Sequence, residues 1–557
     1  MTRLNLALSL MIFLSVSWLS YGCKTTPSEK SARPKLAVVV VVDQMRADHL
    51  TRFEGVYEHG FARLLNQGAT FTTAYHDHAY TVTGAGHASI SAGVHPSRHG
   101  IVGNHWYDRA ESKEVYCAED TTCPLLGYPE EEADNGRSPV RMLASSLGDW
   151  LKEQSPESKV FGIGRKDRAA IFSAGLKADG AYWYNDGDGN MITSKYYMTS
   201  YPAWVKKFNE SRVVDTYFQE GWHKLKTEQT YFLAREDSFS AENDGKNTAF
   251  PYEFTTKSPK AAEQYYGDLQ STPFSDALLM EFAKALVENE NLGRDDAPDI
   301  LFIGCSAADA IGHTFGPLSQ ESLDHFLRLD AYLGQFFTFL DGKIGNDNYI
   351  TVLSSDHGVM PLPEELARRG FDAKRVSKGE LVVRVGKVLL DLSQELGVSE
   401  RLISGITGFG VIVNYSAVAD KGIRPQELDA RLISRLKDLH PIEDVFSRED
   451  LTEGKTDGRP YRELYAHSFH PDRCGDLMFR IKEYYLLRSS PYGTTHGSPY
   501  PYDTHIPFVV SGPGIAKGQH TQKVRTVDIA PTLANILGID RPVDLDGQSL
   551  FEEIKAK

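Results

Sequence analysis

The sequence predicts an α/β fold in which helices flank a mostly parallel central sheet that carries two inserted subdomains. Several short and nearly continuous apolar runs are typical of strands buried on both faces. Segments with helical periodicity lie between these runs. That alternation of strand and helix favours a parallel sheet.

The expected elements follow in chain order. The predicted strands cover Leu36–Val42, Lys159–Ile163, Ile300–Gly304, Ile350–Ser354 and Ile506–Ser511. The predicted helices between them include Phe61–Gln67, Pro139–Gln154, Phe274–Glu288 and Glu321–Phe339. Ligands of such sheets bind beyond the carboxyl ends of the strands, so the residues that follow each strand deserve most weight.

Two stretches interrupt the pattern and are expected to be insertions. Residues 176–270 are rich in aromatic side chains, and residues 363–488 mix strand-like and helix-like segments. The catalytic core would then consist of residues 36–175, 271–362 and 489–557. Within the first insertion, the run Asp186–Asn190 lacks the full ligand spacing of a calcium loop, so a hairpin turn is predicted there.

The N-terminus indicates export. Arg3 precedes the apolar run Leu8–Leu19, which is too short for a spanning helix, and residues 1–22 are typical of a secretory signal. Cys23 follows a small residue, as in bacterial lipoproteins, although Tyr21 is bulky for such a site. Residues 23–35 would form a flexible tether. We therefore expect a periplasmic protein or a membrane-anchored lipoprotein, with a plain signal peptide as the alternative.

Composition excludes one class of partner. The 557 residues contain 60 Lys and Arg against 75 Asp and Glu, a formal charge of −15. Such a chain repels the phosphate backbone, so no nucleic acid binding is expected.

None of the five cysteines forms a CxxC motif, which gives no sign of a cysteine zinc site. Cys117 and Cys123 are the best candidates for a disulfide, because export permits one.

Four segments offer metal ligands. Asp356 and His357 follow a predicted strand and supply one oxygen and one nitrogen ligand. Asp309 and His313 are four residues apart, which places them on one face if the segment is helical. Their ordinary interpretations are a polar strand end and a helix-surface pair.

The other two segments are weaker signals by themselves. His496 lies in a loop rich in Gly, Ser and Pro, where a histidine is commonly just solvated. Asp43 follows five valines, so it needs a partner if it is buried, or else it caps the following helix.

Polar residues suited to a phosphate group come from three further segments. Thr83 opens the run Thr-Gly-Ala-Gly-His at a predicted helix start, where backbone amides favour an anion and glycine permits close approach. Asn104 follows a glycine turn and has an amide to donate. Lys166 and Arg168 would point the same way if their segment is extended. An N-cap threonine and polar loops are the alternatives.

Together these residues resemble the alkaline phosphatase superfamily, and most of all its single-threonine, zinc-dependent branch of PafA-like and PhoK-like monoesterases. The motifs are Asp, Thr-Gly-x-Gly-His, Gly-Asn, Lys-x-Arg, Asp-x-x-x-His, Asp-His-Gly and His-Gly-Ser, in that order. The resemblance extends from about residue 37 to residue 550. It implies an alkaline phosphatase-like fold.

The resemblance also implies a role for each residue and two Zn2+ ions per subunit. Asp309, His313 and His496 would bind one zinc ion, and Asp43, Asp356, His357 and Thr83 the other. Thr83 would be the nucleophile that forms a phosphothreonine. Asn104, Lys166 and Arg168 would bind the phosphoryl oxygens of small phosphate esters.

Other members of the superfamily supply the alternative functions. A phosphodiesterase or nucleotide pyrophosphatase uses the same metal ligands but generally lacks the Lys-x-Arg pair. A sulfatase is disfavoured, because Val94 stands where a sulfatase carries the Cys or Ser that becomes formylglycine. An inactive phosphate- or metal-binding protein would lack a ligand or the nucleophile, and none is missing. The sequence gives no prediction of the natural substrate or of the oligomeric state.

Overall fold

A computed structural model describes residues 33–128, 136–219, 221–253, 259–407, 410–452 and 458–557. The expected signal peptide, Cys23 and most of the expected tether lie outside these residues. Among the described residues, no helix combines the length and the apolar character that a membrane span requires.

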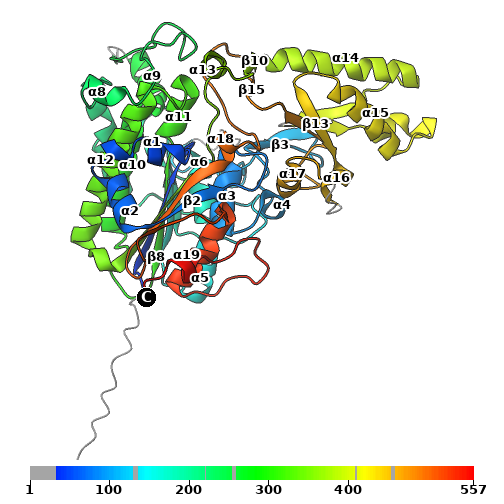
Figure 1. Cartoon of the computed structure of the whole chain (residues 1–557). Helices are drawn as coiled ribbons and strands as arrows, with labels where there is room; N and C mark the ends of the chain where they lie inside the picture. The colour runs from blue at the N-terminus through cyan, green and yellow to red at the C-terminus, as the bar shows by residue number, and fades with distance from the viewer. Residues whose placement is uncertain (1–32, 129–135, 220, 254–258, 408–409, 453–457) are drawn as a thin grey trace, which may run out of the picture. The chain divides into compact units, whose positions relative to one another are not determined.

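A ten-stranded sheet forms the centre of the fold (Figure 1). Its order is β17 (Gly518–His520), β2 (Ala69–Tyr75), β16 (His505–Ser511), β9 (Tyr349–Ser354), β1 (Leu36–Val42), β8 (Asp299–Cys305), β5 (Val160–Gly164), β6 (Gly180–Tyr184) and β7 (Met191–Ile192), and β18 (Val524–Arg525) pairs with β2. Strands β9, β1, β8, β5 and β6 are parallel, which confirms the predicted fold class.

The direction of β16 corrects one prediction. The sequence places Ile506–Ser511 among the parallel strands, but β16 is antiparallel to both of its neighbours, β9 and β2. The chain reaches β16 from the loop that carries His496, and this loop lies at the carboxyl edge of the parallel strands. It therefore enters the sheet at that edge and runs in the opposite direction.

Alternation along β1 divides the core into two layers. Leu36, Val38, Val40 and Val42 pack with the helices of one face, and the three residues between them pack on the other face. The first face carries α2 (Gly60–Gln67), α10 (Phe274–Asn289) and α12 (Gln320–Lys343), and the second carries α5 (Leu147–Gln154) and α19 (Ile529–Leu537). Figure 1 shows these two groups of helices on either side of the sheet.

One predicted helix begins later than expected. The sequence predicts a helix from Pro139, whereas α5 begins at Leu147. Ser146 and Asp149 form a capping box, in which each side chain binds the backbone N–H of the other residue. This reciprocal cap satisfies two free N–H groups at the start of α5 and defines where the helix begins.

The aromatic residues of the segment 176–270 are largely structural. Tyr182, Tyr184, Trp222 and Tyr231 are buried in the same core as α10 and α12. Strands β6 and β7 pair in an antiparallel manner, so the run Asp186–Asn190 is a hairpin turn, as predicted.

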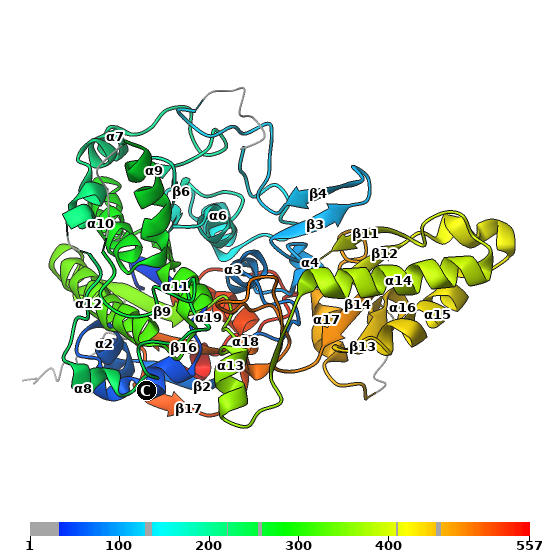
Figure 2. The ribbon, with the colours of Figure 1, turned by 90° about the horizontal axis from the view of Figure 1, so that it is seen from above.

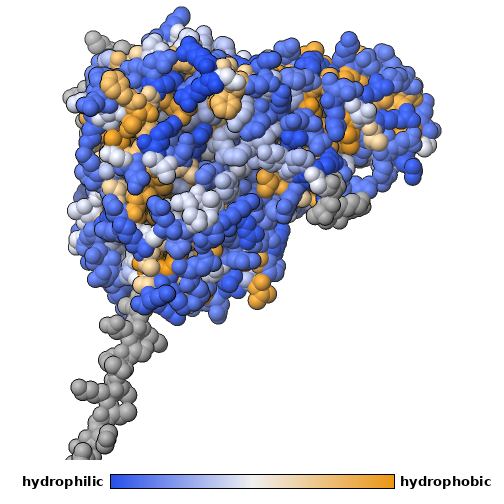
Figure 3. All heavy atoms as spheres, viewed as in Figure 1, coloured by the Kyte–Doolittle hydropathy of each residue, from blue (hydrophilic) through white to orange (hydrophobic). Residues whose placement is uncertain are grey.

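The segment 363–488 builds a second, smaller sheet with its own core. Strands β11 (Ile403–Thr407), β12 (Gly410–Val413), β14 (Leu477–Ile481) and β13 (Ile442–Ser447) are antiparallel in that order. Helices α14 (Lys378–Leu396) and α15 (Pro425–Lys437) run alongside this sheet (Figure 2). The face seen in Figure 3 is mainly hydrophilic, with hydrophobic side chains in scattered patches.

The four described cysteines are free, so the expected pair of Cys117 and Cys123 does not form. Cys117 is fully buried and its Sγ atom lies close to Gly84, whereas Cys123 is partly exposed. Burial raises the pKa of the Cys117 thiol to about 12, which keeps it protonated at neutral pH. The position of Cys117 against the helix that starts at Thr83 directs its thiol away from a disulfide partner.

Candidate active site

Neighbouring strand ends assemble a first cluster. Strands β1 and β9 are adjacent and parallel; Asp43 follows β1, and Asp356 and His357 come shortly after β9. The Nε2 atom of His357 lies 3.5 Å from Asp43 Oδ1 and 3.5 Å from Asp356 Oδ2. All three residues are fully buried. The sheet thus places two carboxylates and an imidazole around one point.

A second cluster forms beside the other neighbour of β1. Helix α11 (Ala307–Phe315) follows β8 and carries Asp309 and His313 one turn apart. His313 Nε2 lies 3.2 Å from Asp309 Oδ1, and His496 Nε2 lies 3.5 Å from the same oxygen. The helical alternative for this motif is therefore the one that the structure has, and a distant loop brings the third residue.

Backbone carbonyls orient both histidines. The Nδ1 atom of His313 lies 2.8 Å from the carbonyl oxygen of Thr494, and that of His496 lies 2.8 Å from the carbonyl oxygen of Thr81. A ring nitrogen that donates to a carbonyl leaves the opposite nitrogen with a free lone pair. Both Nε2 atoms therefore face Asp309 with a free lone pair that could bind a metal ion.

Lys166 joins the two clusters. It follows β5, and its Nζ atom lies 2.6 Å from Asp43 Oδ2 and 2.6 Å from Asp309 Oδ2. The rings of His357 and His496 are stacked with their centroids 3.5 Å apart. Lys166 and the six Asp and His residues expected as metal ligands thus come from five separate segments and meet in one place.

Thr83 faces this place from the start of a helix. It is the first residue of α3 (Thr83–Ala92), and its Oγ1 atom accepts a hydrogen bond of 3.2 Å from Lys166 Nζ. The side-chain oxygen of Asn104 accepts a hydrogen bond of 2.9 Å from the backbone N–H of Gly84. Asn104 is therefore fixed next to Thr83, and its NH2 group is left as a donor.

The backbone at Arg168 is helical, whereas the sequence allowed an extended segment. The segment after Lys166 is not extended, because α6 (Asp167–Ala174) begins at once and contains Arg168 in its first turn. The Nη1 atom of Arg168 donates to the hydroxyl of Tyr116 over 3.2 Å, and that hydroxyl in turn donates to Asp167. These neighbours, rather than strand alternation, determine the direction of Arg168.

Burial and neighbouring charges shift the pKa values of the site. Burial and the neighbouring Asp43 raise the pKa of Asp356 well above its ordinary value. Burial, followed by repulsion from His496, lowers the pKa of His357 well below its ordinary value. Burial opposes ionisation of Asp309, but His313 and Lys166 outweigh it and lower the pKa of this carboxyl. A cation among these groups would relieve the repulsion between the carboxylates.

Sequence reasoning missed one residue that touches both clusters. The backbone N–H of Gln44 donates to Asp356 Oδ1 over 3.1 Å, and its Nε2 atom donates to Asp309 Oδ1 over 2.8 Å. A β-carbon on Gly312 would lie 1.8 Å from Gln44 Oε1, so glycine in α11 makes room for this side chain. Only its position directly after Asp43 could have drawn attention to Gln44.

Two further supporting residues were also missed. His87 places its Nε2 atom 3.6 Å from Asp356 Oδ2, while its Nδ1 atom pairs with Ser173 Oγ at 2.9 Å. Asp503 Oδ2 accepts hydrogen bonds from the backbone N–H groups of Gly497 and Ser498 and thereby holds the loop of His496. His87 stands inside the Thr-Gly-x-Gly-His motif, whereas no local pattern distinguishes Asp503.

The residues present fit divalent metal ions. Asp43 Oδ1, Asp356 Oδ2 and His357 Nε2 are buried and have no hydrogen-bond partner among the described residues. In each of the groups Asp309/His313/His496 and Asp43/Asp309/His357, the ligand atoms lie within 4.8 Å of one another. Carboxylate oxygens and imidazole nitrogens are ligands that zinc and similar ions prefer.

This chain is similar in sequence and in structure to known proteins. The family model described as type I phosphodiesterase / nucleotide pyrophosphatase matches residues 37–501. The chain is 35% identical over 529 residues to alkaline phosphatase PafA of Elizabethkingia meningoseptica, covering 94% of this chain and 95% of that protein. The crystal structure of wild type PafA matches with a TM-score of 0.87 at 33% identity, covering 94% of this chain and 99% of that one.

Two other relatives are similar over comparable lengths. A protein of Myroides odoratus named calcium-transporting ATPase is 35% identical over 548 residues, covering 95% of this chain and 96% of that protein. Alkaline phosphatase PhoV of Synechococcus elongatus is 32% identical over 565 residues, covering 99% of this chain and 99% of that protein.

The chain therefore belongs to the type I phosphodiesterase / nucleotide pyrophosphatase family of the alkaline phosphatase superfamily. Within that superfamily it is similar to PafA and PhoV over nearly its whole length, which confirms the resemblance found in the sequence.

The close contact between α3 and the loop after β9 gives a prediction about stability. A β-carbon on Gly86 would lie 2.1 Å from the carbonyl oxygen of Asp356, and backbone on both sides cannot move aside cheaply. We expect Gly86→Ala to lower the free energy of unfolding by about 3 kcal/mol through overpacking. The denaturant midpoint of unfolding measures this change.

Gly342→Ala is the matched control, because Gly342 also lies in a helix and a β-carbon there meets no atom within 4 Å. This change should alter stability by no more than about 1 kcal/mol, in the stabilising direction. Equal stability of the two variants would show that α3 does not pack on Asp356 this closely.

Proposed function

We propose that this chain is an exported alkaline phosphatase that hydrolyses phosphate monoesters through a phosphothreonine on Thr83. The observation that carries the proposal is the position of the Thr83 hydroxyl. It lies at a helix start, 3.2 Å from a lysine that contacts a carboxylate of each metal-ligand cluster. The proposal of export rests on the N-terminal sequence. The exported protein would be either free in the periplasm or anchored to a membrane by a lipid at Cys23.

Two zinc ions suit the ligand set. Asp309, His313 and His496 would hold one ion, and Asp43, Asp356 and His357 would hold the other together with Thr83. Three protein ligands and one exchangeable position are the usual pattern of a catalytic zinc site. When bound, the ions supply Lewis-acid stabilisation of negatively charged oxygens.

The chain's own groups provide nucleophile and orientation. In the first step, the Thr83 hydroxyl gives its proton to water and Oγ1 bonds to phosphorus. The ester P–O bond breaks, and the alcohol oxygen leaves with the bonding electrons and takes up a proton from water. The ammonium of Lys166 donates to Oγ1 and favours its ionised form. In the second step, water attacks the phosphothreonine, phosphate is released and the Thr83 hydroxyl is restored.

Cationic and amide donors favour a monoester. A phosphate monoester carries more negative charge on its unsubstituted oxygens than a diester does. Lys166, Arg168 and Asn104 are assigned to these oxygens, where fixed donors stabilise the charge of the transition state. The family model keeps a phosphodiesterase as the second candidate function, since its description names that activity.

The nucleophile assignment gives the first functional prediction. Thr83→Ala should lower kcat for a nitrophenyl phosphate monoester by at least about 10³-fold, because the covalent step is lost. Thr338→Ala, a change at an exposed position of α12, should leave kcat unchanged. Undiminished hydrolysis by Thr83→Ala would falsify the assignment while leaving the enzyme class open.

The charge argument gives a prediction about substrate choice. The parent protein should hydrolyse a nitrophenyl phosphate monoester faster than the corresponding diester under identical conditions. Lys166→Ala should lower kcat/KM for the monoester by about 10²-fold and for the diester by less. The control is Lys177→Ala, since the ammonium group of Lys177 forms an exposed ion pair with Glu153. A parent preference for the diester would favour the phosphodiesterase instead.

Metal dependence is tested by chelation. Removal of bound metal should abolish hydrolysis, and zinc should restore it more completely than magnesium, since mixed Asp and His ligands suit zinc better. Metal analysis before and after chelation reports identity and stoichiometry. Full activity in a preparation without bound metal would contradict the two-zinc mechanism.

A further inference from the structure

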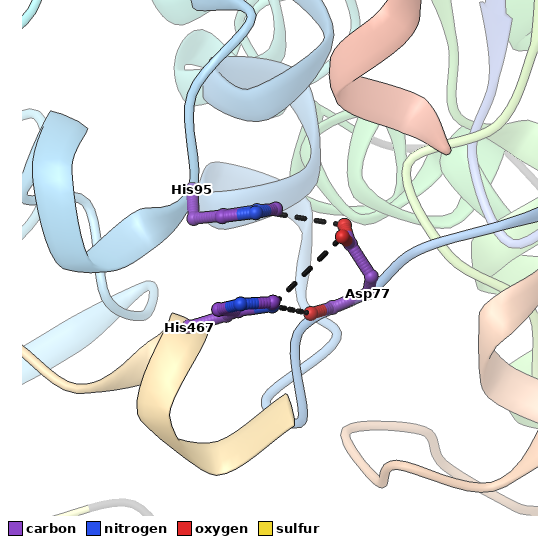
Figure 4. Close-up of side chains that lie close together, drawn as sticks. All are labelled: Asp77, His95 and His467. Atoms are coloured by element: carbon purple, nitrogen blue, oxygen red, sulfur yellow. Dashed lines mark hydrogen bonds and ion pairs between the residues drawn. The ribbon is translucent and has the colours of Figure 1, made fainter. Parts of the chain in front are cut away.

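Three residues outside the candidate active site form another cluster of potential metal ligands (Figure 4). Asp77 lies in the loop after β2, His95 directly precedes α4 (Pro96–His99), and His467 belongs to α17 (Arg462–Ser468). Asp77 Oδ1 lies 3.4 Å from His95 Nδ1, and Asp77 Oδ2 lies 3.8 Å from His467 Nδ1. Segments far apart in the sequence thus direct one oxygen and two nitrogens toward one another.

Two of these atoms lack a hydrogen-bond partner in the part of the chain that the structure describes. Asp77 Oδ1 and His95 Nδ1 are buried without a hydrogen-bond partner among the described residues, and Asp77 and His95 are 7% and 5% exposed. The separation of 3.4 Å is too long for a well-formed hydrogen bond between them. Burying a carboxylate oxygen and an imidazole nitrogen without partners is costly. The arrangement is explained if a ligand lies between them.

The nearest cation does not fill this role. Arg525 Nη1 reaches only to 3.9 Å from Asp77 Oδ2. Its guanidinium instead donates to Asp528 Oδ1 over 2.9 Å and to the carbonyl oxygen of Asp546 over 2.8 Å. Arg525 is the unfavourable neighbour for a metal ion, but its charge is largely balanced by Asp528.

The ionisation states at neutral pH suit a metal. Burial raises the pKa of Asp77 to about 6, which His467 and Arg525 partly oppose, so the carboxyl is ionised at pH 7. Burial lowers the pKa of His95 to about 2, and the neighbouring His467 and Arg525 add to this effect. A carboxylate and a neutral imidazole are the forms that bind metal ions.

The arrangement of the two imidazole rings shows which changes metal binding would require. The rings of His95 and His467 are stacked at 4.0 Å with 9° between their planes, and both present Nδ1 to Asp77. His467 Nδ1 also lies 2.6 Å from the carbonyl oxygen of Asp77. A metal ion would replace this hydrogen bond, and the two rings would have to tilt toward each other. A cavity of about 490 Å³ borders all three residues and gives access from solvent.

We propose that Asp77, His95 and His467 bind a divalent transition-metal ion of the zinc class. The site shares no residue with the candidate active site. Ser468, the neighbour of His467 in α17, accepts hydrogen bonds from the backbone N–H groups of Ala79 and Tyr80 in the loop that leads to Thr83. An ion held by both Asp77 and His467 therefore adds a second link between α17 and this loop, which is a structural role.

The test is a zinc count on the purified full chain. Parent protein and variants are stripped with a chelator, titrated with zinc, desalted and analysed for bound metal. Asp77→Asn and His467→Gln should each bind one zinc ion fewer per chain than the parent. His470→Gln, a change at a nearby histidine outside the cluster, should bind as many as the parent. Equal zinc counts in parent, Asp77→Asn and His467→Gln would overturn the proposal.

A second measurement uses the parent alone, in case the variants fail to fold. Zinc should protect His467 from acylation by diethylpyrocarbonate, mapped by mass spectrometry, while His470 continues to react. Reaction of His467 at the same rate with and without zinc would equally overturn the proposal. The difference of one ion does not depend on zinc in the active site, so failure of the proposed function remains distinguishable.

Discussion

Three carboxylates buried together at one edge of the sheet are the constraint on which the rest of the structure depends. Asp43, Asp309 and Asp356 are withdrawn from water, and a single lysine, Lys166, contacts two of them. Buried like charges are costly unless cations are nearby, so these carboxylates need bound cations in addition to Lys166 to be stable in their ionised form. Such cations would also reverse the local field. A chain of net charge −15 can in this way still attract a phosphate ester into one small region.

The central sheet fixes the positions of most residues of this site. Strands β9, β1, β8 and β5 are consecutive and parallel, and each is followed by a residue of the site. Rigid strand ends hold their side chains more precisely than loops do, because strand spacing is fixed by backbone hydrogen bonds. His496 is the exception, since it comes from a loop. Its position depends on Asp503, which binds the N–H groups of Gly497 and Ser498, and on the carbonyl oxygen of Thr81.

The difference between residues at strand ends and residues held by distant contacts explains what could be predicted from the sequence. Apolar runs and the polar residues after them identify parallel strands and their ends, so Asp43, Asp309, Asp356 and His357 could be expected to meet. Features set by contacts between distant segments could not be predicted. The direction of Arg168 depends on Tyr116. The start of α5 was missed for a different reason, because its local cap lies within a longer periodic pattern. Gln44 bridges both clusters through contacts that no short motif encodes.

The segment 363–488 is connected to the site more closely than an insertion at the surface would be. Ser468 of α17 binds the N–H groups of Ala79 and Tyr80, and the next residue, Thr81, binds the loop of His496 through both its hydroxyl and its carbonyl group. Each such bond contributes about 1 kcal/mol, so no single one fixes the loop. Their succession along three consecutive residues does, because displacing α17 would break several at once. The position of His496 and of the helix that begins at Thr83 therefore depends on how α17 packs against residues 79–81.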